Sequence, residues 1–217
     1  MKPIGRVLAV TSFIVILLLT ACQPGTVATN SSGEKLPLFM DDFSDHDNGW
    51  KLLVSPQGIV QYDGDSLRIL VNEVNTDYYT TQDFSLTDSI LDIDASYVSG
   101  PSNNLFGLIC RAQDKQNYYS FLISSDGYYG ISKVENGVRT LLGSSKMQPT
   151  SLIATGGTTN HLRTDCVGEN LTLFINWNQA LTVKDSTFKS GNAGLIAATM
   201  EEPGVDIRFD NFIVVVP

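Results

Sequence analysis

Two aspartates, Asp92 and Asp94, have a spacing that could support acid–base chemistry in this chain. They flank Ile93 in a stretch that reads as a β-strand, so both carboxylates lie on one face of that strand. Neighbouring carboxylates can divide the roles of acid and base, but a strand face exposed to water has the same pattern. The sequence has no G-x-S-x-G motif and no cluster of metal-binding histidines, and His46 and His161 lie in turn-rich sequence where we expect them to be solvated. We therefore predict no catalytic residue.

Aromatic and arginine side chains supply the groups that bind sugars. Aromatic rings stack on the apolar faces of pyranoses, and planar polar groups bind hydroxyls in pairs. Consecutive tyrosines on a strand point to opposite faces, so one of each pair is available to a ligand while the other packs in the core. Arg111 has the parity of Gly107 and Ile109 and is expected on an outward sheet face, although an ion pair with an aspartate explains it equally well. The candidate ligand-binding residues are Arg111, Tyr119, Tyr128 and Trp177.

Short apolar segments separated by turn residues make up the chain from residue 38 onward. The segment 89–98 alternates apolar and polar residues, which is typical of a strand with one face in the core and one in water. Asp-Gly and Asn-Gly pairs between segments suit tight hairpins. Helical spacing of apolar residues is not sustained anywhere in this part of the chain. We predict an all-β, antiparallel two-sheet β-sandwich of about a dozen strands, including 66–71, 89–98, 117–124, 127–134, 171–176 and 206–216.

Several short motifs follow one another in a recognisable order. DDFSD at 41–45 and GW at 49–50 open the domain, LTLFIN occupies 171–176, and FDNF closes it at 209–212. This order resembles the concanavalin A-like lectin/glucanase superfamily, and within it the laminin-G-like and keto-disaccharide-hydrolase-like domains. The resemblance covers residues 38–217 and implies a jelly roll whose concave face, in many relatives, meets carbohydrate.

The resemblance also has one visible departure and one absence. Where relatives tend to place Asn-Gly at a hairpin, this chain has Asn176 followed by Trp177, so we expect the indole ring to be exposed or folded over a neighbour. Family-16 glucanases carry an E-x-D-x-x-E strand, and no such spacing occurs here. The resemblance therefore implies a binding protein more readily than a hydrolase.

A structural calcium ion is a further implication of the resemblance. In many jelly rolls of this superfamily one calcium ion ties the first strand to the last, through backbone carbonyls and an aspartate. Asp42 and Asp210 lie in the matching segments, although direct pairing of the two terminal strands explains them without metal. The sequence at 45–49 is not an EF-hand, because Gly49 stands at the fifth position, where an oxygen ligand is required.

The N-terminal segment determines the expected location. A positively charged start precedes the uncharged stretch 7–19, which has the length of a signal-peptide core and falls short of the roughly 20 residues that span a bilayer. The string LTAC ending at Cys22 matches the bacterial lipobox, whereas an ordinary secretory signal would leave this cysteine unexplained. We expect a lipoprotein signal peptide at 1–21, lipid on Cys22, and a flexible tether at 22–37. The domain would then face outside the cytoplasm, anchored to the cell membrane or the outer membrane.

Charge and cysteine content narrow the expected partners. Removal of 21 of the 217 residues takes away Lys2 and Arg6 and changes the formal net charge from −9 to about −11. Such an acidic body is repelled by nucleic acid, so no nucleic-acid partner is expected. Cys110 and Cys166 form an even pair in strand-like sequence, and we expect a disulfide between neighbouring strands, with two buried free thiols as the alternative.

These observations predict a lipid-anchored protein whose β-sandwich binds carbohydrate without catalysis. Its expected partners are the membrane, through Cys22, and a glycan or polysaccharide. One alternative is an enzyme similar to the keto-disaccharide hydrolases, and another is a structural or protein-interaction lipoprotein without a small ligand. A deep groove lined by carboxylates would favour the enzyme, a groove with exposed rings would favour sugar binding, and a flat apolar patch would favour a protein partner.

Overall fold

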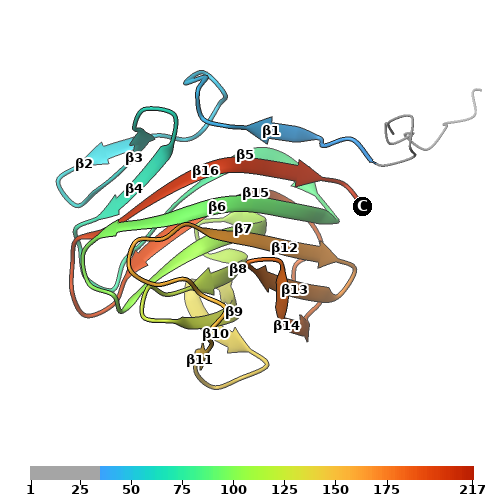
Figure 1. Cartoon of the computed structure of the whole chain (residues 1–217). Coiled ribbons are helices and arrows are strands. Elements are labelled where there is room, and N and C mark those ends of the chain that lie inside the picture. The colour runs from blue at the N-terminus through green and yellow to red at the C-terminus, as the bar shows by residue number, and fades with distance from the viewer. Residues whose placement is uncertain (1–34) are drawn as a thin grey trace, which may run out of the picture.

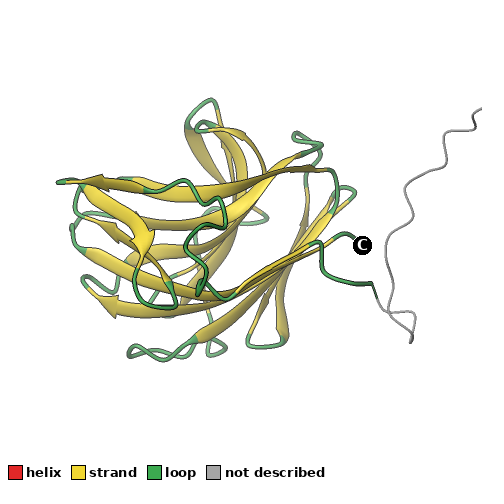
Figure 2. Ribbon diagram, turned by 90° about the horizontal axis from the view of Figure 1, so that it is seen from above, coloured by secondary structure: helices red, strands yellow, loops and turns green. Residues whose placement is uncertain are grey.

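The chain folds into two antiparallel β-sheets that pack face to face (Figures 1 and 2). The structure, a computed structural model, describes residues 35–217. Cys22, the expected signal peptide and most of the expected tether lie outside these residues. Residues 35–217 contain sixteen strands and no helix, so this part of the chain has no helical segment that could cross a bilayer.

The larger sheet has nine strands and brings the two ends of the described chain together. Its order is β14-β13-β12-β6-β16-β4-β3-β2, and β1 pairs with the later part of β16. The first and last strands are thus direct neighbours, with Asp41 opposite Phe212. The strands of this nine-stranded sheet are β1 (Phe39–Asp41), β2 (Leu53–Ser55), β3 (Gly58–Tyr62), β4 (Leu67–Val71), β6 (Ser89–Ser99), β12 (Asn160–Val167), β13 (Asn170–Ile175), β14 (Asn178–Lys184) and β16 (Val205–Val215).

The smaller sheet has seven strands in the order β10-β9-β8-β7-β15-β5, with β11 paired to β9. Its two edges on this path are therefore β10 and β5. The strands of this seven-stranded sheet are β5 (Asp77–Leu86), β7 (Asn104–Asp114), β8 (Asn117–Ile123), β9 (Tyr128–Glu135), β10 (Val138–Leu142), β11 (Gln148–Pro149) and β15 (Gly191–Thr199).

The core between the sheets follows from the alternation seen in the sequence. Along β6 every second side chain is buried, and Leu91, Ile93 and Ala95 are fully so. The facing sheet contributes the rings of Phe106 and Phe121, and the neighbouring strand β16 contributes that of Phe209; all three are at most 1% exposed. Each such side chain contributes roughly 1.5–3 kcal/mol by leaving water. The predicted all-β sandwich is confirmed.

A disulfide joins Cys110 on β7 to Cys166 on β12. The predicted pairing is confirmed, but the two strands are not neighbours, because β7 belongs to the seven-stranded sheet and β12 to the nine-stranded one. Both cysteines face the core, so the bond crosses the interior and ties one sheet to the other.

The opening motif is explained by one buried carboxylate. Asp41, at the end of β1, accepts hydrogen bonds from the backbone amide of Phe43 (2.8 Å), from Asn48 Nδ2 (3.0 Å) and from Trp50 Nε1 (2.7 Å). The rings of Phe43 and Trp50 are then held in the core beside Phe212. The spacing of the motif thus places the side chains that hold the first strand and the following loop against the core.

Candidate functional site

The outer face of the seven-stranded sheet is curved into a groove. Asp77 and Arg139 lie on its two edge strands, β5 and β10, yet Arg139 Nη2 lies 2.6 Å from Asp77 Oδ2. Strands in a sheet are spaced about 4.8 Å apart, so a flat sheet would hold these residues far from each other. The ion pair therefore crosses the groove, and Tyr118 reaches it from below by donating its hydroxyl to Asp77 Oδ2 (2.9 Å).

The floor of this groove is a second apolar cluster, separate from the core between the sheets. It consists of side chains that alternate along each strand with the core-facing ones. Most are fully buried although they lie on the outer face, because the curvature and the crossing side chains cover them. The cluster comprises Leu105, Ile109, Ala112, Tyr118, Leu122, Val134, Ile196 and Ala198, with Tyr79, Met147 and Met200 packed against it.

A cavity of about 500 Å³ opens at one end of the groove, which we call the Tyr128 cavity. Tyr128, at the start of β9, is 41% exposed and stands beside an apolar floor that includes Leu122. Asp126 and Arg139 add polar groups to the lining. A volume of this size with mostly apolar walls and a few polar groups is typical of small-ligand sites. Its remaining lining residues are Asn103, Asn104, Leu105, Ser124, Leu141, Lys146, Met147 and Met200.

Buried hydrogen bonds fix the rim of the Tyr128 cavity. Asn104 is fully buried; its Nδ2 donates to the carbonyl of Pro101 (2.7 Å), and its Oδ1 accepts from the amide of Ser125 (3.0 Å). The amide of Asp126 in turn donates to the carbonyl of Ser102 (3.1 Å). These hydrogen bonds hold together the loop before β7 and the turn before β9, so the rim of the cavity has a defined conformation.

Arg139 carries a donor that the protein leaves without a partner. Its Nη2 is engaged by Asp77, but its Nε is buried and has no hydrogen-bond acceptor within the described residues. A buried donor without a partner costs about 1–3 kcal/mol. The Nε is out of reach of a ligand, but Arg139 lines the Tyr128 cavity with the 25% of its side chain that is exposed, and this part could donate to a ligand hydroxyl.

The other end of the groove holds a second cavity, of about 560 Å³. Tyr79 forms part of its wall, together with Lys51, Asp114 and Asn192. Burial of the Tyr79 hydroxyl raises the pKa of that group to about 12, with Asp114 and Asp77 adding to the effect. This phenol therefore remains a neutral hydrogen-bonding group at physiological pH.

Two of the expected ligand-binding residues lie inside the protein. Tyr119 is fully buried between the sheets, and burial raises the pKa of its hydroxyl to about 12, helped by its hydrogen bond to Asp185. Its neighbour Tyr118 faces the groove instead, so the expectation assigned the wrong member of the pair to the surface. The parity argument itself holds, because adjacent strand residues do point to opposite sides.

Arg111 also departs from its expected position on an outward face. A β-bulge follows Cys110, and Arg111 there has a φ of 51°, which turns its side chain inward. The guanidinium is 2% exposed and donates to the carbonyls of Thr87 (2.8 Å) and Phe188 (3.2 Å) and to Asp88 (3.2 Å). Simple alternation of strand residues fails at a bulge, and this arginine has a structural role.

Trp177 is placed as its turn position indicated, on the opposite side of the molecule. It is 78% exposed, and its ring stacks on that of His161 with centroids 3.9 Å apart. His161 was expected to be solvated, but it lies on β12, and its side chain is 18% exposed because Asp94 (2.9 Å from Nδ1) and Asp92 (3.2 Å from Nε2) hold it. His46 is exposed, as expected.

The paired aspartates face the outer side of the nine-stranded sheet, as alternation predicted. Burial raises the pKa of Asp92, while Arg163 and His161 lower it in part. Burial likewise raises the pKa of Asp210, and nearby Asp94 adds to that shift through charge repulsion. Both Asp92 and Asp94 contact His161, so they act as its supports.

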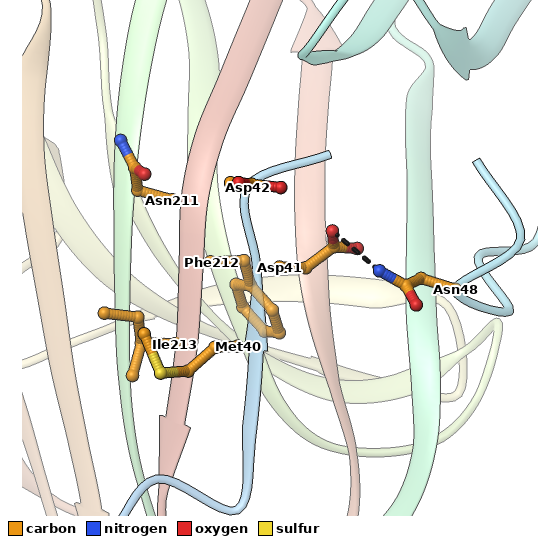
Figure 3. Close-up of a pocket in the computed structure, with 7 residues that line it drawn as sticks. All are labelled: Met40, Asp41, Asp42, Asn48, Asn211, Phe212 and Ile213. Atoms are coloured by element: carbon orange, nitrogen blue, oxygen red, sulfur yellow. Dashed lines mark hydrogen bonds between the residues drawn. The ribbon is translucent and has the colours of Figure 1, made fainter. Parts of the chain in front are cut away.

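The two aspartates expected to hold calcium, Asp42 and Asp210, both accept hydrogen bonds from neighbouring groups. Asp42 is exposed, and its carboxylate accepts hydrogen bonds from the amide and hydroxyl of Ser44, which lower its pKa. Asp210 Oδ1 accepts from the amide of Asn211 (2.7 Å). A small hollow of about 230 Å³ lies between β1 and β16, but its buried Asp41 is already bonded to Asn48 (Figure 3). Calcium requires six to eight oxygens, and no group of three or more acidic, histidine or cysteine side chains within 35–217 could hold a metal.

The groove residues that sequence reasoning missed are Asp77, Tyr79, Tyr118 and Arg139. Arg139 lies in a short segment after the Asn136-Gly137 turn, and Asp77 begins a strand after a loop. Local sequence patterns could identify each of these as a strand residue, but the contacts among them depend on the curvature of the whole sheet. The tyrosine pairs did indicate that one ring of each pair faces the ligand side, but the sequence did not show which ring of the pair faces the core.

Comparison with known proteins identifies the fold. No protein-family model matches the sequence, and no curated protein matches it significantly. Among solved structures, the carbohydrate-binding module CBM66 from Bacillus subtilis is similar with a TM-score of 0.61 and 19% identity, over 77% of this chain and 95% of that one. The GH43 protein BlXynB from Bacillus licheniformis gives 0.61 and 12% identity over 82% of this chain, which spans only 39% of that protein.

A third similar structure is a protein of unknown function with a galectin-like fold from Bacillus subtilis. Its TM-score is 0.59 at 12% identity, covering 83% of this chain and 96% of that one. The chain therefore shares the fold of these solved structures, which agrees with the β-sandwich that its sequence resemblance implied.

Proposed function

We propose that this protein is a membrane-anchored, non-catalytic carbohydrate-binding protein whose glycan ligand occupies the Tyr128 cavity. The observation that carries the proposal is a cavity that presents the exposed ring of Tyr128 together with the partly exposed side chain of Arg139. A pyranose offers an apolar face to the ring and hydroxyl oxygens to the guanidinium. The similarity in fold to a carbohydrate-binding module supports this choice of ligand class.

The carboxylates of the groove support binding in preference to hydrolysis. Glycosidases require one carboxylic acid and one free carboxylate on either side of the scissile bond. Here Asp77 is tied to Arg139 and Tyr118, and Asp126 accepts a hydrogen bond from the hydroxyl of Ser124. Asp114, in the second cavity, accepts hydrogen bonds from the amide of Gln116 and from Asn117 Nδ2. Each of these carboxylates thus already has partners within the protein.

The anchor is proposed from the N-terminal sequence. The charged start, the 7–19 apolar stretch and the LTAC string support cleavage before Cys22 and lipid attachment there. The Cys110–Cys166 disulfide fits an oxidising compartment outside the cytoplasm. Metabolic labelling with a radioactive fatty acid tests this part, because a Cys22→Ala variant should lose all label.

Isothermal titration of the full chain, purified in detergent, tests the binding site. The probes are soluble glucans, xylans, fructans, galactans and peptidoglycan fragments. We expect at least one to bind, and Tyr128→Ala to weaken that binding about tenfold, the equivalent of about 1.4 kcal/mol. Tyr128→Leu is the matched control for lost apolar area, since it keeps bulk without a ring.

Arg139→Lys tests the carrying observation directly. Lysine can keep the ion pair with Asp77 but lacks the planar guanidinium with its several donors, so we expect weaker binding and an unchanged unfolding midpoint. If no probe binds the wild-type chain, or if Arg139→Lys and Tyr128→Ala both bind as the wild type does, the groove is not a glycan site.

A further inference from the structure

The β13–β14 hairpin holds Trp177 in a conformation that a tryptophan rarely adopts. Ile175 pairs with Asn178, so the turn consists of Asn176 and Trp177 alone, with φ values of 48° and 69°. Two-residue turns with positive φ at both positions strongly favour Asn-Gly. A bulky residue with positive φ is a genuine outlier, and such strain tends to persist at ligand-binding positions.

The ring of Trp177 is oriented although it is 78% exposed. One of its faces stacks on His161, with centroids 3.9 Å apart and planes 16° from parallel. His161 cannot turn freely, because Asp92 and Asp94 each contact one of its ring nitrogens. The indole therefore presents a held, flat apolar surface to solvent on its other face.

Polar groups continue from this ring across the outer face of the nine-stranded sheet. Asp94 contacts His161 through Oδ1 and accepts a hydrogen bond from Asn211 Nδ2 (3.0 Å) through Oδ2. A β-bulge in β16 opposite Asp94 and Asp92 leaves Asn211 exposed, with a φ of 56°. Bulges re-aim side chains in this way beside functional sites. The bulge thus sets a carboxylate and an amide next to the platform.

We propose that Trp177, Asp94 and Asn211 form a second glycan-binding site, on the sheet opposite the groove. One pyranose would stack on the free face of Trp177, and the hydroxyls of an adjoining sugar in the same chain would bond to the Asp94 carboxylate and the Asn211 amide. The inference rests on the proposed carbohydrate binding and extends it to two separate sites. When a polysaccharide occupies one site, its effective concentration at the second site is high. Its overall avidity can therefore exceed the affinity of either site alone.

The charge around the platform selects among possible partners. Asp92, Asp94 and Asp210 all lie on this face of the sheet. The nearby Arg163 and Arg208 are themselves paired with Asp165 and Asp63, so the acidic groups remain in excess. Such a surface repels an anionic lipid headgroup, whereas carboxylates and amides bind neutral sugar hydroxyls. A neutral or amino-substituted glycan is therefore the ligand class that fits.

Tryptophan fluorescence can report on this site alone. The chain has two tryptophans: Trp50 is 6% exposed and bonded to Asp41, and Trp177 is open to solvent. The full chain in detergent is titrated with the polysaccharide that binds best in calorimetry, and quenching by acrylamide is followed. We expect the polysaccharide to protect the exposed fluorophore at least twofold, and this protection to be absent in Trp177→Gly.

Two substitutions of Trp177 separate binding from folding. Trp177→Gly removes the ring at a position where glycine is free of strain, so its unfolding midpoint should stay close to that of the wild type. Its affinity for immobilised polysaccharide should fall tenfold or more as the second contact is lost. Trp177→Tyr keeps a ring and should retain most of the binding, and Asn211→Ala should weaken it about threefold.

The outcomes distinguish this proposal from the groove. If Trp177→Gly binds as the wild type does and Trp177 is never protected, the second site is overturned and the groove stands. If protection of Trp177 persists in Arg139→Lys and Tyr128→Ala, in which binding in the groove is weakened, the second site is supported independently. If no polysaccharide binds at all, both proposals fail.

Discussion

The outer faces of the two sheets differ in how far their aromatic rings are exposed to solvent. On the seven-stranded sheet the curvature folds the face inward, and Tyr118 is 2% exposed although it lies outside the main core. On the nine-stranded sheet Trp177 projects from a turn with 78% of its surface open. The first face is recessed and supported from many strands, whereas the second depends on one strained hairpin and the histidine beneath it.

The difference between the recessed groove and the exposed Trp177 indicates where a substitution changes both stability and ligand affinity. A groove built from buried side chains cannot be altered without disturbing packing, since close-packed interiors respond to small changes in volume. A ring at a hairpin turn can be removed with little loss of buried area. Substitutions of the buried side chains of the groove, such as Tyr118, should therefore affect folding and binding together, whereas substitutions at Trp177 should affect binding alone.

The largest expected effect comes from removing the covalent link between the two faces. The Cys110–Cys166 bond closes a loop of 56 residues across both sheets. Loss of this constraint on the unfolded chain costs about 4 kcal/mol, so a Cys110→Ala/Cys166→Ala variant should unfold at much lower urea concentration. Both proposed sites should then fail together, and a loss below about 1 kcal/mol would show that the sheets hold without the bond.

Substitution of Arg111 should cost about 2–4 kcal/mol in unfolding free energy. The guanidinium bonds two backbone carbonyls and Asp88 in the interior, and Arg111→Met would leave them unpaired. Arg139→Lys is the opposite case, since it should change ligand affinity with little change in stability. Urea unfolding of both variants tests this contrast, and equal stability losses would contradict it.

Acid should lower the free energy of unfolding of the whole domain by protonating Asp185. Burial alone would raise the pKa of this group, but hydrogen bonds from Tyr119 and Thr187 lower it to about 2. Its folded pKa lies below the ordinary value of 3.8, so its contribution is fully present above that pH and is lost as the pH falls through about 2. The contribution is about 1–2 kcal/mol, and Asp185→Asn should remove it from the pH profile of unfolding between pH 4 and pH 2.

The smallest expected effect is that of Tyr118→Phe in the groove. The change removes the hydrogen bond to Asp77 but keeps the ring, so about 1 kcal/mol of stability should be lost. Binding of the polysaccharide in the groove should weaken with it, while protection of Trp177 stays the same. A variant that loses protection of Trp177 as well would show that the two faces are coupled.

Much of the fold followed from local patterns. The alternation in 89–98 gave both the extent of β6 and the side on which Asp92 and Asp94 lie. The family resemblance placed Trp177 at a hairpin, and the cysteine pair gave the disulfide. These features depend on near neighbours or on simple pairing.

The errors have physical causes that a single strand does not reveal. Arg111 sits in a bulge, where alternation is broken. The Tyr118–Tyr119 pair fits either orientation until the partner strands are known. His161 was assigned to a turn, although Asn160–Val167 is a regular strand whose side chains alternate in burial. The groove itself arises from the curvature of six strands, which is a property of the whole sheet.

The ion pair between Asp77 and Arg139 links the two edge strands of the groove. Because these edges are linked, the groove neither widens nor narrows easily, and it has its shape before a ligand binds. Less conformational freedom is then lost on association, and such preorganisation favours tighter binding. The free and occupied forms of this protein should accordingly superimpose closely along that entire face.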